Sequence, residues 1–271
     1  MAPLKIGAAL DLADLPAHRD WLFEADRDVE IQDFIAYETL SSGFEDFISA
    51  AKEALDGHSG RRGIHGPFEG LDIDNKDPEL RPIITARFLK AMEAAERIGA
   101  RQMVLHSPYT LWYQNNLYAS PTYAEDKLAR IHEVLAPVVK SGEDTGVQIV
   151  IENIYDARPE TRRAMVESFA SPAIALSVDT GHAQIARRMS GGPTVEDVLR
   201  DAGGQLAHVH LQDLDGHADR HWAPGDGEIE WHGVFRALAD CTSTPHLVLE
   251  LRAAADIPKG FAYLRDQGLA Q

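Results

Sequence analysis

Short runs of alternating apolar and polar residues recur along the chain, separated by longer stretches with helical periodicity. Strict alternation is typical of strands, whereas apolar residues spaced three or four apart are typical of amphipathic helices. The pattern predicts eight strands, at 5–10, 29–34, 61–66, 102–107, 147–153, 174–179, 206–211 and 246–251. It predicts helices at 42–56, 79–99, 121–143, 159–169, 194–202, 231–240 and 257–267, and a less regular helical stretch within 11–28.

No linker rich in proline, glycine or serine divides this series. Pro159 and Pro258 stand near the starts of two predicted helices, where a missing backbone N–H costs nothing. Eight strands that are each followed by a helix predict an α/β fold, a (β/α)8 TIM barrel that forms a single domain over residues 1–271.

The alternation also assigns side chains to the two faces of a strand. In 206–211, the apolar side chains Ala207, Val209 and Leu211 share one face, and His208 and His210 share the other. A barrel strand packs its apolar face against the helices and turns the other face inward. The same test places four ligand-type side chains inside the barrel near strand ends: Glu152, Asp179, His210 and Glu250.

Two more strands end in an inward-facing histidine, His65 and His106. Six consecutive strands therefore finish in side chains that bind Zn²⁺, Mn²⁺ or Fe²⁺ well. Each residue alone has a simpler explanation, since a strand-end Asp179 can cap a helix and a lone histidine is usually structural. Acidic groups that face one another repel, and a divalent cation removes that repulsion. The sequence thus predicts a metal site at the carboxyl ends of the strands, with His208 in a supporting role.

A second layer of ligand-type residues follows the sixth and seventh strands. His182 lies three residues after Asp179, at the start of the next helix, and Asp219 and His221 are separated by one residue in a loop. These three side chains could bind an additional ion. The predicted number of ions is therefore one, with as many as three if the additional ligands also bind metal. The alternative is that they form hydrogen bonds with a substrate.

The composition of the chain limits the kinds of molecule that it is expected to bind. The formal charge of −17 argues against a general affinity for nucleic acids or anionic membranes. The single cysteine, Cys241, excludes an internal disulfide. The chain has no apolar stretch of membrane-spanning length, and residues 1–15 lack the pattern of a signal peptide. We therefore expect a cytoplasmic enzyme with a small-molecule substrate.

Several motifs together resemble the xylose isomerase-like TIM-barrel superfamily over roughly residues 5–251. They are IHGPF, LHSP, VIEN, SVDTGH, HVHLQD, DRHWAPGDGEIEW and LVLELR. The superfamily includes sugar and sugar-phosphate isomerases and epimerases, inosose dehydratases and the endonuclease IV enzymes of DNA repair. Homodimers are common in it.

In the epimerase branch, the resemblance implies that Glu152, Asp179, His210 and Glu250 bind one Mn²⁺, Zn²⁺ or Fe²⁺ ion. Glu152 and Glu250 would be catalytic and move a proton, while the ion stabilises the enediolate of a small sugar, polyol or related carbonyl compound. The candidates for substrate binding are His65, His106, His182, Trp112 and Arg252. Tagatose-type epimerases carry a further glutamate where this chain has Arg158, so their substrate specificity does not carry over.

Three alternatives remain. A sugar or inosose dehydratase would use the same metal and base, and a non-catalytic barrel is disfavoured because both glutamates are present. In endonuclease IV nine ligands hold three zinc ions, and all nine types occur here in order: His65, His106, Glu152, Asp179, His182, His210, Asp219, His221 and Glu250. The loops after the third and fourth strands are acidic and uncharged, respectively, which argues against a DNA substrate.

We expect Tyr109, Trp112, Tyr113 and Tyr118 to form a lid over a small ring-shaped ligand, and stacking on a flipped nucleotide is the competing interpretation.

Overall fold

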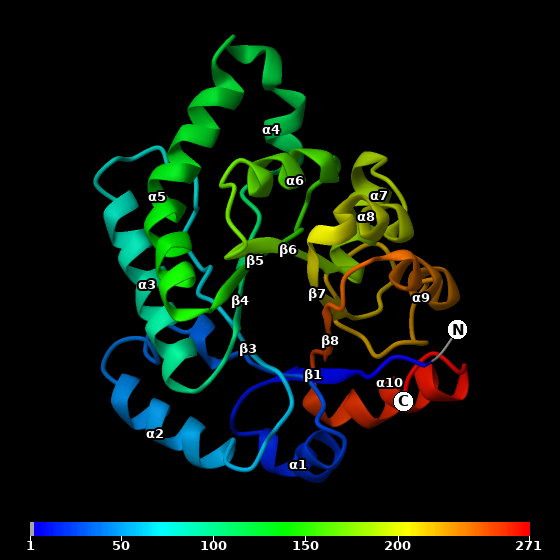
Figure 1. Ribbon diagram of the computed structural model, residues 1–271. Coiled ribbons are helices and arrows are strands. Elements are labelled where there is room, and N and C mark those ends of the chain that lie inside the picture. The colour runs from blue at the N-terminus through cyan, green and yellow to red at the C-terminus, as the bar shows by residue number, and fades with distance from the viewer. Residues whose placement is uncertain (1–2) are drawn as a thin grey trace.

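The computed structural model describes residues 3–271, so the first two residues of the predicted domain lie outside the described part. Eight parallel strands pair in chain order and close into a barrel, with helices around the outside (Figure 1). The predicted TIM barrel is therefore confirmed. The strands are β1 (Gly7–Leu10), β2 (Val29–Ile31), β3 (Arg62–His65), β4 (Gln102–His106), β5 (Gln148–Glu152), β6 (Ile174–Asp179), β7 (Leu206–Leu211) and β8 (His246–Glu250).

The helices of the outer layer follow the predicted series within a few residues at most ends. They are α1 (Leu15–Glu24), α2 (Phe44–Ala54), α3 (Arg81–Arg97), α4 (Leu111–Asn115), α5 (Tyr123–Thr145), α6 (Pro159–Glu167), α7 (Thr180–Ser190), α8 (Val195–Ala202), α9 (Trp231–Asp240) and α10 (Ile257–Asp266). Within residues 3–271, none of these helices has the length and apolar character needed to cross a membrane.

Helices α4 and α7 are absent from the predicted ranges. Helix α7 begins directly at the end of β6, with no loop between them, because the Asp179 side chain caps it. Asp179 Oδ1 accepts a hydrogen bond from the His182 backbone N–H at 2.6 Å. The cap and the strand end are the same residue, so this rim of the barrel continues directly into a helix.

The two faces of the strands pack as the alternation predicts, with one exception. Val209 and Leu211 lie in the apolar layer beneath the helices, whereas Val104 and Val150 form a small cluster inside the barrel. Ala207 was expected on the outer face but packs against the inner cluster. The register between β6 and β7 shifts there by one residue, which turns Ala207 inward and leaves the positions of His208 and His210 unchanged.

A buried arginine forms hydrogen bonds with the backbone of both β5 and β6. Arg162 Nη1 donates to the Ile151 carbonyl oxygen at 2.6 Å and to the Ser177 carbonyl oxygen, and its Nε lies 3.2 Å from Asp156 Oδ2. Both side chains of this ion pair are about 1% exposed. Breaking a buried pair by removing one partner leaves an uncompensated charge in the interior.

We therefore expect Arg162→Met to lower the free energy of unfolding by about 3–5 kcal/mol, measured by urea denaturation. The neighbouring Arg163 serves as the control, because its ion pairs with Asp201 and Glu167 are partly exposed. Arg163→Met should cost no more than about 1 kcal/mol. Equal losses in the two variants would contradict the structural role of Arg162.

Candidate functional site

The carboxyl ends of β5 to β8 bring together the four residues predicted to bind one metal ion. Glu152, Asp179, His210 and Glu250 each offer a ligand atom, and these four atoms lie within 4.8 Å of one another. His210 Nδ1 is 3.3 Å from Glu152 Oε1 and 3.3 Å from Glu250 Oε2. All four side chains are buried. The two glutamates thus flank one point at the mouth of the barrel.

The other candidate ligands form two adjoining groups. His65 and His106 lie beside Glu152, with their Nε2 atoms 3.6 Å and 3.7 Å from its Oε2. His182, Asp219 and His221 form a separate set, again with ligand atoms within 4.8 Å. All nine residues named in the sequence therefore meet at one end of the barrel.

Backbone carbonyl oxygens accept hydrogen bonds from three of the histidine rings. The Nδ1 atoms of His65, His182 and His221 lie 2.8–3.1 Å from the carbonyl oxygens of Gly66, Asn153 and Glu250, respectively. A carbonyl oxygen only accepts hydrogen bonds, so each of these Nδ1 atoms carries the proton. In the neutral form of each ring, Nε2 carries the lone pair, which is the usual arrangement of metal-binding histidines.

The charges around Glu152 favour its ionised form. Burial opposes ionisation, but the charge of His210 and the close contacts with the His182, His210 and His65 rings hold the pKa of Glu152 well below its usual range. Burial is likewise outweighed at His210 and His182, where the carboxylates raise the pKa of each ring well above its ordinary value. The site therefore strongly favours positive charge in the space between its carboxylates.

A divalent cation fits this donor set. Glu152 Oε2 and His210 Nδ1 are both buried and have no hydrogen-bond partner within residues 3–271. Burial and the charges of Glu152 and Glu250 raise the pKa of Asp179, although His182 and His221 oppose that rise. Nitrogen and oxygen donors of this kind suit Zn²⁺, Mn²⁺ and Fe²⁺. Unsatisfied buried donors that converge on one point are what a metal site requires.

Residues that the sequence interpretation overlooked hold these ligands in place. Gln212 Nε2 donates to Asp179 Oδ1 at 3.2 Å, and Gln32 Nε2 donates to Glu250 Oε1 at 2.5 Å. Gly181 leaves space for the Gln212 side chain beside Asp179, since a Cβ at position 181 would lie 2.4 Å from the Gln212 side chain. Alternation in 29–34 places Gln32 on the same face as Glu30, and this signal could have identified both residues.

The loop after β7 carries backbone strain next to the second group of ligands. His221 has φ of 50°, in the left-handed region that non-glycine residues rarely adopt. Gln212 Oε1 accepts the His221 backbone N–H at 3.0 Å, and the Asp213–Trp222 bridge closes the loop. Strain of this kind costs about 1–3 kcal/mol and is found mostly at functional sites.

A cavity of about 430 Å³ lies above the quartet. Glu152 and Glu250 line it, whereas Asp179 and His210 are 0% exposed and lie beneath it. The other lining residues include His65, His106, His182, Asp219, His221 and Arg252. The cavity therefore presents the two glutamates and most of the predicted substrate-binding residues to one ligand-sized space.

Arg252 and Trp112 occupy the edges of this space. Arg252 is exposed, and its Nη2 donates to the Asp219 carbonyl oxygen at 3.0 Å rather than pairing with a rim carboxylate. Trp112 is 74% exposed and lines a neighbouring cavity of about 400 Å³, which shares Phe68, His106 and Tyr155 with the first. A cavity of about 690 Å³ opens at the opposite end of the barrel and contains none of the nine ligand residues.

The four aromatic residues predicted to form a lid differ in their exposure. Tyr109 and Tyr113 are buried, and Tyr113 stacks on Tyr123 with ring centroids 5.5 Å apart. The ammonium of Lys127 also lies 5.0 Å from the centre of the Tyr113 ring. Tyr109 and Tyr113 line the same cavity of about 400 Å³ as Trp112, and among the four only Trp112 and Tyr118 are exposed.

Comparison with curated proteins gives distant relatives. An uncharacterised protein from Methanocaldococcus jannaschii is 25% identical over 212 residues, which cover 75% of this chain and 68% of that protein. A D-psicose 3-epimerase from Agrobacterium fabrum is 23% identical over 194 residues, which cover 68% of this chain and 62% of the epimerase.

Solved structures share the fold over nearly the whole chain. A D-tagatose 3-epimerase-like protein superposes with a TM-score of 0.78 at 21% identity and covers 97% of this chain and 96% of its own. A protein from Thermus thermophilus, in crystals soaked with zinc chloride, has a TM-score of 0.74 at 26% identity and covers 97% of both chains. The model of the xylose isomerase-like TIM-barrel family matches residues 27–267. The chain belongs to the xylose isomerase-like TIM-barrel family.

Proposed function

We propose that this protein is a divalent-metal-dependent epimerase or isomerase of a small sugar or sugar-derived carbonyl compound. The observation that carries the proposal is the convergence of Glu152, Asp179, His210 and Glu250 beneath a cavity into which both glutamates project. The relationship to a D-psicose 3-epimerase and the zinc-soaked structure of a 26% identical protein support it.

The four residues of the quartet would hold Mn²⁺, Zn²⁺ or Fe²⁺. When bound, such a cation polarises a carbonyl group and stabilises negative charge on neighbouring oxygens. Glu152 lines the cavity, and its carboxylate would accept a carbon-bound proton from the substrate. Glu250 lies at the same distance from His210 Nδ1 and also lines the cavity, and it would return the proton to the substrate.

The walls of the cavity would position the substrate. His65, His106 and His182 line it close to the glutamates, and Arg252 lies at its edge. These side chains can bind hydroxyl and carbonyl oxygens of a polar ring. Trp112 lines the adjoining cavity, so it would contact a part of the substrate remote from the reacting carbon.

Proton exchange with solvent tests this reaction directly. Manganese-supplemented protein is incubated in D₂O with a panel of ketoses and 3-ketoglycosides, and the products are analysed by NMR. We expect carbon-bound deuterium in a substrate and its epimer or isomer. Loss of water from the substrate would favour a dehydratase, and the absence of exchange across the panel would count against the proposal.

The two adjoining groups of ligands favour a second candidate, a multi-zinc phosphodiesterase. His65, His106 and Glu152 form one group, and His182, Asp219 and His221 form another. Clustered metal ions can activate water for attack on phosphorus. The charge of −17 weighs against a DNA substrate. Cleavage of a duplex with an abasic site would favour this candidate over the epimerase.

The number of ions can be tested with a double variant. We expect that the protein with His182→Ala and His221→Ala still binds one ion per chain, because neither residue belongs to the quartet. Metal content is measured by inductively coupled plasma mass spectrometry after gel filtration in zinc. A protein with His217→Ala and His232→Ala, both exposed, is the matched control. Complete loss of zinc from the first variant alone would show that the groups bind metal as one unit.

A further inference from the structure

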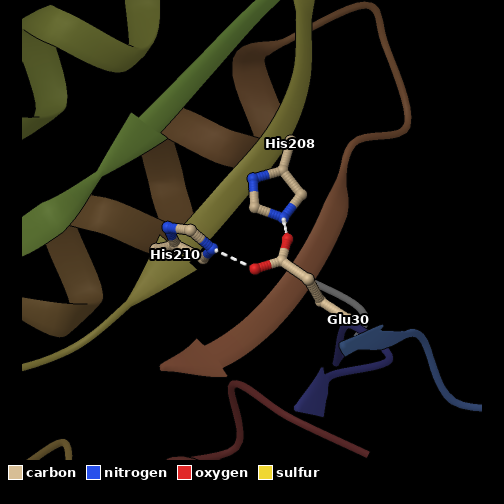
Figure 2. Close-up of side chains that lie close together, drawn as sticks. All are labelled: Glu30, His208 and His210. Carbon is tan, nitrogen blue, oxygen red and sulfur yellow. Dashed lines mark hydrogen bonds and ion pairs between the residues drawn. The ribbon is translucent and has the colours of Figure 1, made fainter. Parts of the chain in front are cut away.

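A buried glutamate lies below the quartet, on the shortest strand of the barrel. Glu30 is the middle residue of β2, is 2% exposed, and points inward toward β7. Figure 2 shows its carboxylate between the rings of His208 and His210, with one oxygen directed at each ring. The rings are nearly perpendicular, with an angle of 89° between their planes.

The two contacts of Glu30 differ in quality. Its Oε1 and His210 Nε2 form a hydrogen bond of 3.0 Å. Its Oε2 is also 3.0 Å from His208 Nε2, but that nitrogen is not aligned for a hydrogen bond. His208 is anchored elsewhere, since its Nδ1 lies 2.9 Å from Ser177 Oγ. The well-formed bond of Glu30 is therefore the one to His210.

This bond sets the orientation of the His210 ring. With Nε2–H donated to Glu30, the lone pair of His210 is on Nδ1, and Nδ1 faces Glu152 and Glu250. The Nδ1 atoms of His65, His182 and His221 contact backbone carbonyl oxygens. Substitution of a side chain does not remove these acceptors. The Nε2 atom of His65 faces Glu152, and those of His182 and His221 face Asp219. In His210 it is Nδ1, opposite the bond to Glu30, that faces the two glutamates.

We infer that Glu30 is a positioning residue, which fixes the ring and the tautomer of His210 so that Nδ1 is presented to a divalent cation. The inference rests on the proposed metal-dependent function. An ionised carboxylate that accepts from a histidine also makes the opposite nitrogen a stronger ligand. Glu30 thus acts on the metal through His210 and touches neither the ion nor the substrate.

The electrostatics agree with this role. The Glu30 carboxylate is buried, its Oε1 accepts a hydrogen bond from His210 Nε2, and its Oε2 lies 3.0 Å from His208 Nε2. Glu30 therefore remains a charged acceptor in the barrel interior. The arrangement fits a separate metal site less well, because its two oxygens face different rings and His210 already belongs to the quartet.

The test measures zinc affinity in Glu30→Gln, by competition with a chromogenic chelator. We expect a dissociation constant about 10–100-fold weaker than in the wild type, since glutamine no longer enforces one tautomer of His210. Asp28→Asn is the matched control. Asp28 is another buried acid just before β2, and it pairs with Arg61 rather than with His210. That variant should bind zinc as the wild type does.

A second readout separates positioning from a purely structural role. In the zinc-loaded wild type, ¹⁵N NMR should show a His210 Nε2–H protected from solvent exchange, and Glu30→Gln should lose that protection. A lower melting temperature with unchanged zinc affinity and unchanged protection would overturn the inference. If Glu30→Gln fails to fold, Glu30→Asp decides. Aspartate keeps the negative charge on a side chain that is one methylene group shorter, so its carboxylate lies farther from His210. A zinc affinity equal to that of the wild type would contradict the positioning role.

The outcomes distinguish this inference from the proposed function. If the wild type binds no zinc, the proposed metal site is wrong. If the wild type binds zinc and Glu30→Gln binds it equally well, only the role of Glu30 is wrong. If Glu30→Gln loses one bound ion and retains another at full affinity, Glu30 is itself a ligand, and the positioning role is again overturned.

Discussion

Glu152→Gln is expected to lower turnover of the sugar substrate by roughly 10²–10⁴-fold, the usual contribution of a general acid or base. Glutamine has nearly the same shape and keeps a carbonyl oxygen that can accept from His182 and His210. It cannot take up a proton, and it brings no negative charge to the cation. The loss should therefore appear in kcat rather than in folding.

The measurement is steady-state kinetics on the substrate identified by deuterium exchange, with circular dichroism to verify the fold. Glu160→Gln is the control, because Glu160 is exposed in the first turn of the helix that follows β5. It should retain full activity. Unchanged turnover in Glu152→Gln would remove Glu152 from the proton transfer.

Asp179→Asn is expected to weaken zinc binding by at least about 100-fold, the upper end of what loss of an outer partner alone costs. Asp179 has two geometrically supported roles, as a cap of α7 and as a member of the quartet. Asparagine caps helices as well as aspartate does, but it is a neutral and weaker ligand. The substitution therefore separates the two roles.

Chelator competition gives the affinity, and circular dichroism and thermal unfolding report on α7. Asp197→Asn, an exposed change in the first turn of α8, should leave zinc affinity unaltered. If Asp179→Asn disturbs the helix but binds zinc normally, Asp179 is only a cap.

The position of the quartet could be predicted because a strand has a repeat of two. Once the strands were placed, Glu152, Asp179 and Glu250 had to face inward at strand ends that meet on one rim. Ala207 broke the rule through a one-residue shift in register, which depends on the pairing of β6 with β7 rather than on the sequence of β7 alone.

The supporting residues were harder to predict. Glu30 lies on a strand of three residues, and alternation places it on the same face as Gln32 without indicating what it contacts. Its importance comes from a partner 180 positions away in the chain. Tyr113 looked like part of an exposed lid because tyrosine suits both an interior and a binding surface, and its packing on Tyr123 and Lys127 decided between them.

Anomalous scattering from crystals grown with manganese or zinc chloride tests the central claim most directly, because it locates each ion. The account predicts a peak within bonding distance of Glu152, Asp179, Glu250 and His210 Nδ1. A metal-supplemented protein with no ion at that point, or with ions bound only elsewhere, would contradict it.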